Sequence, residues 1–173
     1  MRSAMAISPV AWLTSPPNPV SPARVLPNYR PPVRVYEFKG PQKFLRAAGY
    51  SKSQGGLANP WGEWWTPEEV VAGIDMHLEQ FEGWLSANEL RRALPARYRA
   101  VAAICRDWND FSEVWELSLP SGEVLQGLAG QTKEQPEHSH LDPNKRTTPM
   151  LLGGAEQVFF KVKNPFWVQR IHW

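Results

Sequence analysis

The amino-acid sequence predicts an α+β protein with a mixed or antiparallel sheet, and three observations lead to this class. A strand pattern opens the folded part of the chain, helical patterns occupy residues 66–106, and three or four strand patterns then follow in succession. The 173 residues are 42% hydrophobic and 21% charged, which fits a soluble globular protein with a real core. We therefore expect one domain that combines a sheet with a helical middle segment.

The first 32 residues predict an extended arm or linker, which either extends from the domain or lies on it, and residues 33–173 form the single domain. Proline fixes φ and lacks an N–H group, so a high proline density disfavours helices and central strands. The segment contains Pro9, Pro16, Pro17, Pro19, Pro22, Pro27, Pro31 and Pro32.

The start of the chain resembles a signal peptide only weakly, because Pro9 interrupts its short apolar part. No apolar run reaches the roughly 18 residues that a membrane-spanning helix needs. We expect no signal peptide and no membrane span.

Residues 33–38 alternate with a period of two, which predicts a strand with Arg34, Tyr36 and Phe38 on one face. An arginine on such a face is either a surface or salt-bridged residue, or a clamp for a phosphate group.

Three helical patterns follow in the middle of the chain. Thr66 is the expected N-cap of the first helix, Pro67 suits its first position and Glu69 completes a capping box. A second capping box at residues 86–89 starts another helix, which we expect to stop at Pro95. A third pattern covers about residues 96–105.

Strand patterns return after the helices. Residues 114–119 and 123–127 flank a turn at residues 120–122, which predicts a hairpin. Residues 130–149 are polar and unpatterned, and a loop of this length is often functional. Two further strands are predicted, one after Gly153 and one over residues 166–173.

Glu156 and Gln157 stand where a paired-glycine turn meets the first of these late strands. Adjacent residues on a strand point to opposite faces, so at most one of the two faces a given pocket. They are candidates for functional side chains beside a rigid strand, against the alternative of a polar pair at the edge of a turn.

Aromatic residues are abundant, with nine tryptophans in the chain. Trp61, Trp64 and Trp65 precede the first helical pattern. They either pack in the core or form a stacking wall beside a helix start, which suits a nucleotide. Five arginines in the helical middle form either a solvated face or a partner surface: Arg91, Arg92, Arg97, Arg99 and Arg106.

Several sites with recognisable motifs are not expected. His138 and His140, with Glu137 and Asp142 nearby, have no spacing that justifies a metal site. The single Cys105 excludes an internal disulfide, and we expect it to be a small buried side chain. A phosphate-binding P-loop and a nucleophile elbow are absent. The formal net charge of +2 does not demand nucleic acid as a partner.

Three segments, taken in order over about residues 33–163, resemble a known family. They are the strand with Arg34 and Tyr36, the aromatic–threonine segment at residues 62–68, and the late segment from residue 115 through Gln131 to Gln157. Together they resemble the ADP-ribosyltransferase-like fold of bacterial toxins, which includes mono-ADP-ribosyltransferases and NAD glycohydrolases.

The resemblance implies that NAD is consumed as a substrate, that its nicotinamide–ribose bond is cleaved, and that no metal is required. An arginine holds the NAD phosphates in that family, a Ser/Thr-bearing strand shapes the nicotinamide pocket, and a late Glu or Gln contacts the ribose. Carried over to this chain, the catalytic candidates are Arg34, Glu156 and Gln157, and Gln157 comes ahead of Glu156 because its position resembles the family's Gly-Gly-x-x-Gln element. The candidates for NAD binding are Tyr36, Trp64, Trp65, Thr66 and Gln131.

The chain departs from the family pattern at two places. The arginine precedes the tyrosine instead of following it, so Arg30 or Arg46 can take the role of Arg34. Glu156 and Gln157 are adjacent instead of separated by one residue, which leaves NAD hydrolysis open beside transfer to a protein.

The resemblance further implies a toxin delivered as an effector, either secreted by a specialised system or cytoplasmic. Its partners would be a target protein in a recipient cell and an immunity protein. The alternative function is a noncatalytic module whose tryptophans and arginines bind a protein or a nucleic acid.

Overall fold

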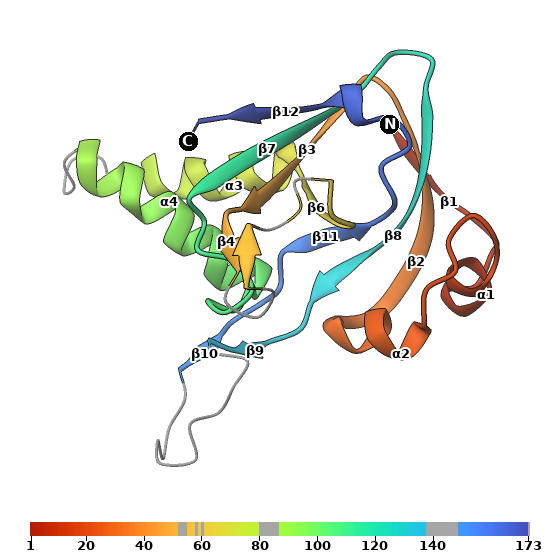
Figure 1. The fold of residues 1–173 in the computed structure, drawn as a ribbon, viewed down its shortest axis with the longest axis horizontal. Coiled ribbons are helices and arrows are strands. Elements are labelled where there is room, and N and C mark those ends of the chain that lie inside the picture. Colours follow the sequence, from red (N-terminus) through yellow and green to blue (C-terminus); the bar gives the residue numbers. More distant parts are fainter. Residues whose placement is uncertain (52–54, 58, 60, 80–86, 138–148, 173) are drawn as a thin grey trace.

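The structure is a computed structural model, and it describes residues 1–51, 55–57, 59, 61–79, 87–137 and 149–172. Its main element is an eight-stranded sheet in the order β1-β2-β8-β11-β6-β3-β7-β12, in which all neighbouring strands are antiparallel (Figure 1). The strands are β1 Arg2–Ala4, β2 Tyr29–Lys39, β8 Val124–Thr132, β11 Glu156–Phe159, β6 Trp64–Pro67, β3 Gln42–Ala48, β7 Glu113–Leu119 and β12 Val168–Ile171.

Two small antiparallel pairs complete the strands. They are β4 Tyr50–Ser51 with β5 Gly56–Leu57, and β9 Gln135–Pro136 with β10 Met150–Leu151. The helices are α1 Pro9–Thr14, α2 Pro22–Val25, α3 Glu68–Glu79 and α4 Ala87–Ala102, with 3₁₀-helices at Leu26–Asn28 and Pro165–Trp167. The expected α+β class with a mainly antiparallel sheet is confirmed. No helix in the described part of the chain has the length and apolar character to cross a membrane.

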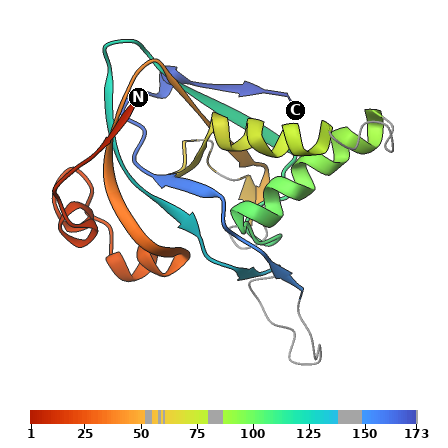
Figure 2. The same cartoon turned by 180° about the vertical axis from the view of Figure 1, so that it is seen from behind.

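One hydrophobic cluster, called the shared core below, contains side chains from both halves of the sheet, β2-β8-β11 and β6-β3-β7. Phe38 of β2 and Leu125 of β8 are buried in the same cluster as Phe44 of β3 and Leu117 of β7. These strands are far apart in the sheet order, so the sheet must fold back on itself to bring their side chains together. Figure 2 shows α3 and α4 at one side of the sheet and α1 and α2 at the other.

The hairpin predicted for residues 114–127 was wrong. β7 pairs with β3 and β12, whereas β8 pairs with β2 and β11. Leu119 and Leu125, on the two sides of the turn, are buried in the shared core, so the turn carries the chain from one half of the sheet to the other. Gly40 fits tightly beside this turn, because a Cβ there would lie 1.8 Å from the Pro120 oxygen.

The proline-rich segment contains regular structure, so the prediction that it holds no helix was wrong. Pro9 and Pro22 lie at the start of α1 and α2, where the missing N–H group has no intrahelical role. β1 pairs with β2, and Trp12 and Val25 are buried against Phe159 of the sheet. Residues 1–28 are therefore packed against the sheet instead of extending from it as a linker.

Two predicted helix boundaries also differ from the structure. Thr66 is not an N-cap, because it lies in β6 and α3 begins at Glu68. Pro95 lies inside α4 and does not end it. Beyond Pro95, Tyr98 and Ala102 are buried against the sheet, and this packing outweighs the local cost of the proline.

Candidate functional site

A cavity of about 730 Å³ opens between the sheet and the helices, a volume that suits a ligand of cofactor size. α2, β3, β6, α4 and β11 all contribute residues to its wall, as does the segment 103–109 that follows α4. The lining side chains that can bind or react with a ligand include Arg24, Arg46, Glu63, Trp64, Gln157 and Lys161.

Gln157 faces this cavity because of its place in β11. It lies opposite Gly130 of β8 and is 6% exposed. Its neighbour Val158 points into the shared core. Phe159, on the same face as Gln157, makes an edge-to-face contact with Trp64 at 5.1 Å between ring centroids. Gln157 and Trp64 thus share one face of two paired strands.

The paired glycines before β11 fix the position of Gln157. Gly153 and Gly154 have φ values of +66° and +95°, which side chains rarely tolerate. The Gly153 N–H donates to Ala100 O at 3.0 Å and the Ala155 N–H donates to Val101 O at 2.9 Å. The turn is therefore docked on the last part of α4, which sets where β11 enters the sheet.

Glu156 lies on the opposite face and does not line the cavity. Its carboxylate forms an ion pair with Arg2 of β1. The Arg2 guanidinium also lies 5.0 Å from the centre of the Tyr36 ring. The hydrogen bond with Glu156 raises the pKa of Arg2. Glu156 thus fastens β1 to the sheet, away from Gln157.

Three other candidates from the sequence also lie outside the cavity lining. Arg34 is exposed on β2, opposite Ala129 of β8. Tyr36 packs against the shared core and Arg2. Gln131 is exposed and lies opposite Glu156 in the pairing of β8 with β11. The structure does not bring these side chains together with Gln157.

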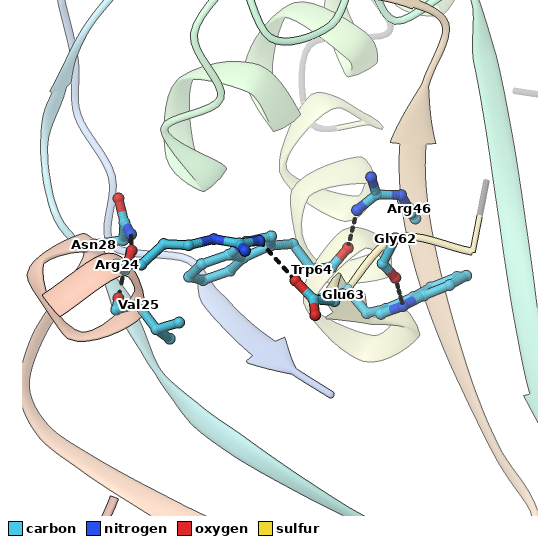
Figure 3. A network of polar contacts seen from close by, with 8 residues as sticks. Arg24, Val25, Asn28, Arg46, Gly62, Glu63 and Trp64 are labelled. Carbon is cyan, nitrogen blue, oxygen red and sulfur yellow. Dashed lines mark hydrogen bonds and ion pairs between the residues drawn. The ribbon is translucent and has the colours of Figure 1, made fainter. Parts of the chain in front are cut away.

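Of the two alternatives to Arg34, Arg46 lines the cavity, whereas Arg30 does not and donates to Leu152 O at 3.0 Å. Its Nη1 donates to Trp64 O at 2.9 Å, and its guanidinium lies against Gly62, where a Cβ would be 2.2 Å from Nη2 (Figure 3). Its Nε is buried without a hydrogen-bond partner among the described residues. Burial lowers the pKa of Arg46, which means that its charge is poorly compensated. A partly buried guanidinium whose Nε has no partner in the described part of the chain favours an anionic ligand.

Trp65 and Thr66 are buried next to the cavity and do not line it. Trp65 is fully buried in the shared core, where its ring stacks on Phe160 at 5.8 Å, and its Nε1 donates to Gly62 O at 2.7 Å. The fully buried Thr66 hydroxyl bonds with the Tyr98 hydroxyl at 2.6 Å. Tyr98 lines the cavity, whereas Trp65 and Thr66 do not.

The sequence reasoning missed an ion pair at the cavity. Arg24 Nη2 lies 2.8 Å from Glu63 Oε2, and Asn28 Nδ2 donates to Arg24 O at 2.9 Å (Figure 3). Arg24 belongs to α2, within the segment that was predicted to be an extended arm. The Ser21–Pro22 pair, which suits a helix start, was the available signal for α2.

Charge and aromatic surface together describe what the cavity can bind. Its lining includes four cationic side chains, Arg24, Arg46, Lys133 and Lys161, against the single described carboxylate of Glu63. Trp61 and Trp108 are 52% and 40% exposed, so their rings are free to stack on a ligand. An anionic ligand with a planar ring matches both features.

The described residues contain no cluster of three or more potential metal ligands. His138, His140 and Asp142 lie outside the described residues, and Glu137 forms an ion pair with Arg106. Cys105 is buried, as expected, and burial raises the pKa of its thiol to about 11.

The comparisons with known proteins give no relative from which a role for these residues could be carried over. No protein-family model, no curated protein and no solved structure matches this chain.

Proposed function

We propose that this protein cleaves the nicotinamide–ribose bond of NAD, as an NAD glycohydrolase or a mono-ADP-ribosyltransferase with an ADP-ribosyltransferase-like fold. The observation that carries the proposal is the convergence of Arg46, Trp64 and Gln157 on one cavity. These three residues are an arginine, an aromatic residue on the strand that also carries Thr66, and a late glutamine, which are the residue types that the resemblance implies.

The sheet order supports the proposal. β3, β6 and β11 carry Arg46, Trp64 and Gln157, and they are consecutive neighbours in the sheet. Three separate segments of the chain therefore lie side by side in the sheet. Arg46 replaces Arg34 in the proposed site, since Arg34 is exposed on β2.

Each residue has a physical role in the proposed reaction. Arg46 and the lysines bind the diphosphate of NAD, and the exposed indoles stack on its rings. Cleavage expels neutral nicotinamide and builds positive charge on the ribose. The Gln157 side-chain oxygen is suited to hydrogen-bond the ribose and to stabilise that charge. The protein mainly positions the substrate, and three paired strands in the interior of a sheet hold such residues rigidly.

The test is incubation of the purified protein with NAD and measurement of free nicotinamide, with and without a cell lysate as a source of acceptors. We expect nicotinamide release by the wild-type protein. No release at any protein concentration, in either condition, would contradict the proposal.

Paired variants locate the site. Gln157→Ala should lower kcat by about 10²–10³-fold, the range for losing one group that stabilises transition-state charge. Glu156→Ala removes a partner of Arg2 on the other face and should preserve kcat. Arg46→Ala should raise KM, whereas Arg34→Ala should not. A lower kcat in Glu156→Ala but not in Gln157→Ala would place the site on the face of Glu156. A higher KM in Arg34→Ala but not in Arg46→Ala would place the phosphate-binding arginine on β2.

A second candidate function is the binding of single-stranded nucleic acid. The exposed rings of Trp61 and Trp108 beside four cationic side chains favour it, because bases stack on aromatic residues while the phosphates bind cations. A protein that binds oligonucleotides in a salt-dependent manner and releases no nicotinamide would have this function instead.

A further inference from the structure

The Glu63 carboxylate is held in the same cavity as Gln157 and Arg46. Its Oε2 accepts a hydrogen bond from Arg24 Nη2 at 2.8 Å, and the side chain keeps 23% of its surface exposed. The backbone of Glu63 is fixed as well, because its carbonyl oxygen accepts from the Phe160 N–H at 2.9 Å. Glu63 is thus held at its backbone and at its carboxylate, and its side chain still lines the cavity (Figure 3).

The proposed hydrolysis releases a proton that some group must accept. The water oxygen forms a bond to ribose C1′, the C1′–nitrogen bond breaks, and its electron pair leaves with neutral nicotinamide. The balanced products of NAD⁺ and water are ADP-ribose, nicotinamide and one proton. Transfer to a hydroxyl acceptor releases a proton in the same way.

Few of the described lining side chains can take this proton. The Gln157 amide is not a base, and arginine and lysine carry no acceptor when charged. Burial raises the pKa of Tyr98 to about 12, so its hydroxyl stays protonated at neutral pH. Glu63 supplies the one carboxylate among the described residues of the lining.

The strand pairing separates the backbones of Glu63 and Gln157 along β11. Glu63 is bonded to Phe160, which follows Gln157 by three positions on the same stretch of chain. At about 3.3 Å per residue, this offset is about 10 Å between backbone positions. Both side chains nevertheless line the same cavity, so a substrate can lie between them.

We propose that Glu63 is the proton acceptor for the water or hydroxyl that attacks the ribose, and that Arg24 positions its carboxylate. This inference rests on the proposed NAD cleavage. It gives the N-terminal segment a part in the reaction, because Arg24 comes from α2.

The experiment compares wild-type protein with Glu63→Gln, Glu63→Ala and a matched control, Glu113→Gln. Glu113 also pairs with an arginine, Arg170, at 3.3 Å and is 24% exposed, but it lies outside the cavity lining. Nicotinamide release gives kcat, and titration with a carba analogue of NAD, which cannot be cleaved, gives the dissociation constant. Sodium azide serves as a nucleophile that needs no deprotonation.

We expect Glu63→Gln to lower kcat by about 10²–10⁴-fold, the range for general base catalysis, with unchanged binding of the analogue. Azide should restore turnover of Glu63→Ala and yield ADP-ribosyl azide, whereas Glu113→Gln should keep the wild-type rate without azide. Arg24→Ala should lower kcat, and Arg24→Lys should recover part of it.

Three outcomes overturn the inference. If the wild-type protein cleaves NAD and Glu63→Gln cleaves it equally well, Glu63 is not the base and the proposed function stands. If Glu63→Gln fails to fold or to bind the analogue, the ion pair with Arg24 is structural. If the wild-type protein releases no nicotinamide, the inference and the proposed function fail together.

Discussion

Thr66 and Tyr98 share a hydrogen bond of 2.6 Å between two hydroxyl groups, and both residues are almost completely buried. The bond joins β6 to α4 directly behind the cavity. It explains why a residue with a good N-cap side chain lies in a strand, since its hydroxyl already has a partner from a helix.

This bond predicts a specific pattern of stability. Thr66→Val leaves the buried Tyr98 hydroxyl without this partner and should cost about 1–3 kcal/mol of unfolding free energy. Tyr98→Phe should cost a similar amount. The double variant should cost less than the sum of the two, because it removes both buried groups together. Urea unfolding of the four proteins measures this coupling, and purely additive losses would show that the bond contributes nothing specific.

The contact of Gly62 with Arg46 predicts that the glycine matters for ligand binding. In Gly62→Ala, the new methyl group would collide with the guanidinium, which must move. We expect weaker binding of the uncleavable NAD analogue by about tenfold, or about 1.4 kcal/mol.

Gly73→Ala is the control for this variant. Gly73 lies in α3, and a Cβ there meets no atom within 4 Å. This change should leave binding of the analogue intact and slightly favour the helix. Equal binding by both variants would mean that the Arg46 position is not important for the ligand.

The burial of Trp12 predicts that the N-terminal segment is needed for stability. Trp12 is 3% exposed and belongs to the cluster with Phe159, so Trp12→Ala should cost about 3–5 kcal/mol. Trp12→Phe should cost less, because the Trp12 Nε1 is buried without a partner among the described residues.

Val10→Ala serves as the control in the same helix, since Val10 is 51% exposed. It should change stability by less than about 0.5 kcal/mol. Thermal unfolding compares the variants, and a Trp12→Ala protein as stable as wild type would support a loosely attached arm instead.

The lowered pKa of Asp110 predicts that the protein loses stability in acid. Partial burial alone would raise the pKa of this carboxyl, but hydrogen bonds from Ser112 and Tyr50 outweigh it and the pKa is lowered. A lowered pKa in the folded state stabilises the protein above the unfolded pKa, near 3.9, and this contribution disappears as the pH falls through the folded pKa.

Asp110→Asn isolates the charge. It should be less stable than wild type in urea at pH 7, and the difference should shrink as the pH falls below about 4. A difference that stays constant down to pH 2 would exclude this role for the Asp110 charge.

The amino-acid pattern alone was sufficient for several parts of the structure. The strand at residues 33–38, the helical middle and the strands near residues 114 and 168 follow from local periodicity. Alternation along a strand also required Glu156 and Gln157 to point to opposite faces, because that geometry is a property of the backbone. The resemblance to the family's Gly-Gly-x-x-Gln element placed Gln157 ahead of Glu156, and it is Gln157 that lines the cavity.

Long-range packing decided the rest. Turn chemistry at residues 120–122 predicted a hairpin, but Leu119 and Leu125 are buried in a core that two distant halves of the sheet share. Prolines in the first 32 residues predicted an arm, but Trp12 and Val25 had apolar surface to bury against the sheet.

The site itself depended most on the tertiary structure. Arg24, Arg46 and Gln157 are separated by many residues, and no local pattern says which arginine meets the glutamine. Only the strand order β11-β6-β3 brings Arg46 to Gln157, and only the packing of α2 brings Arg24 to Glu63. Local sequence sets the face on which a side chain lies, while non-local burial of apolar surface sets which faces meet.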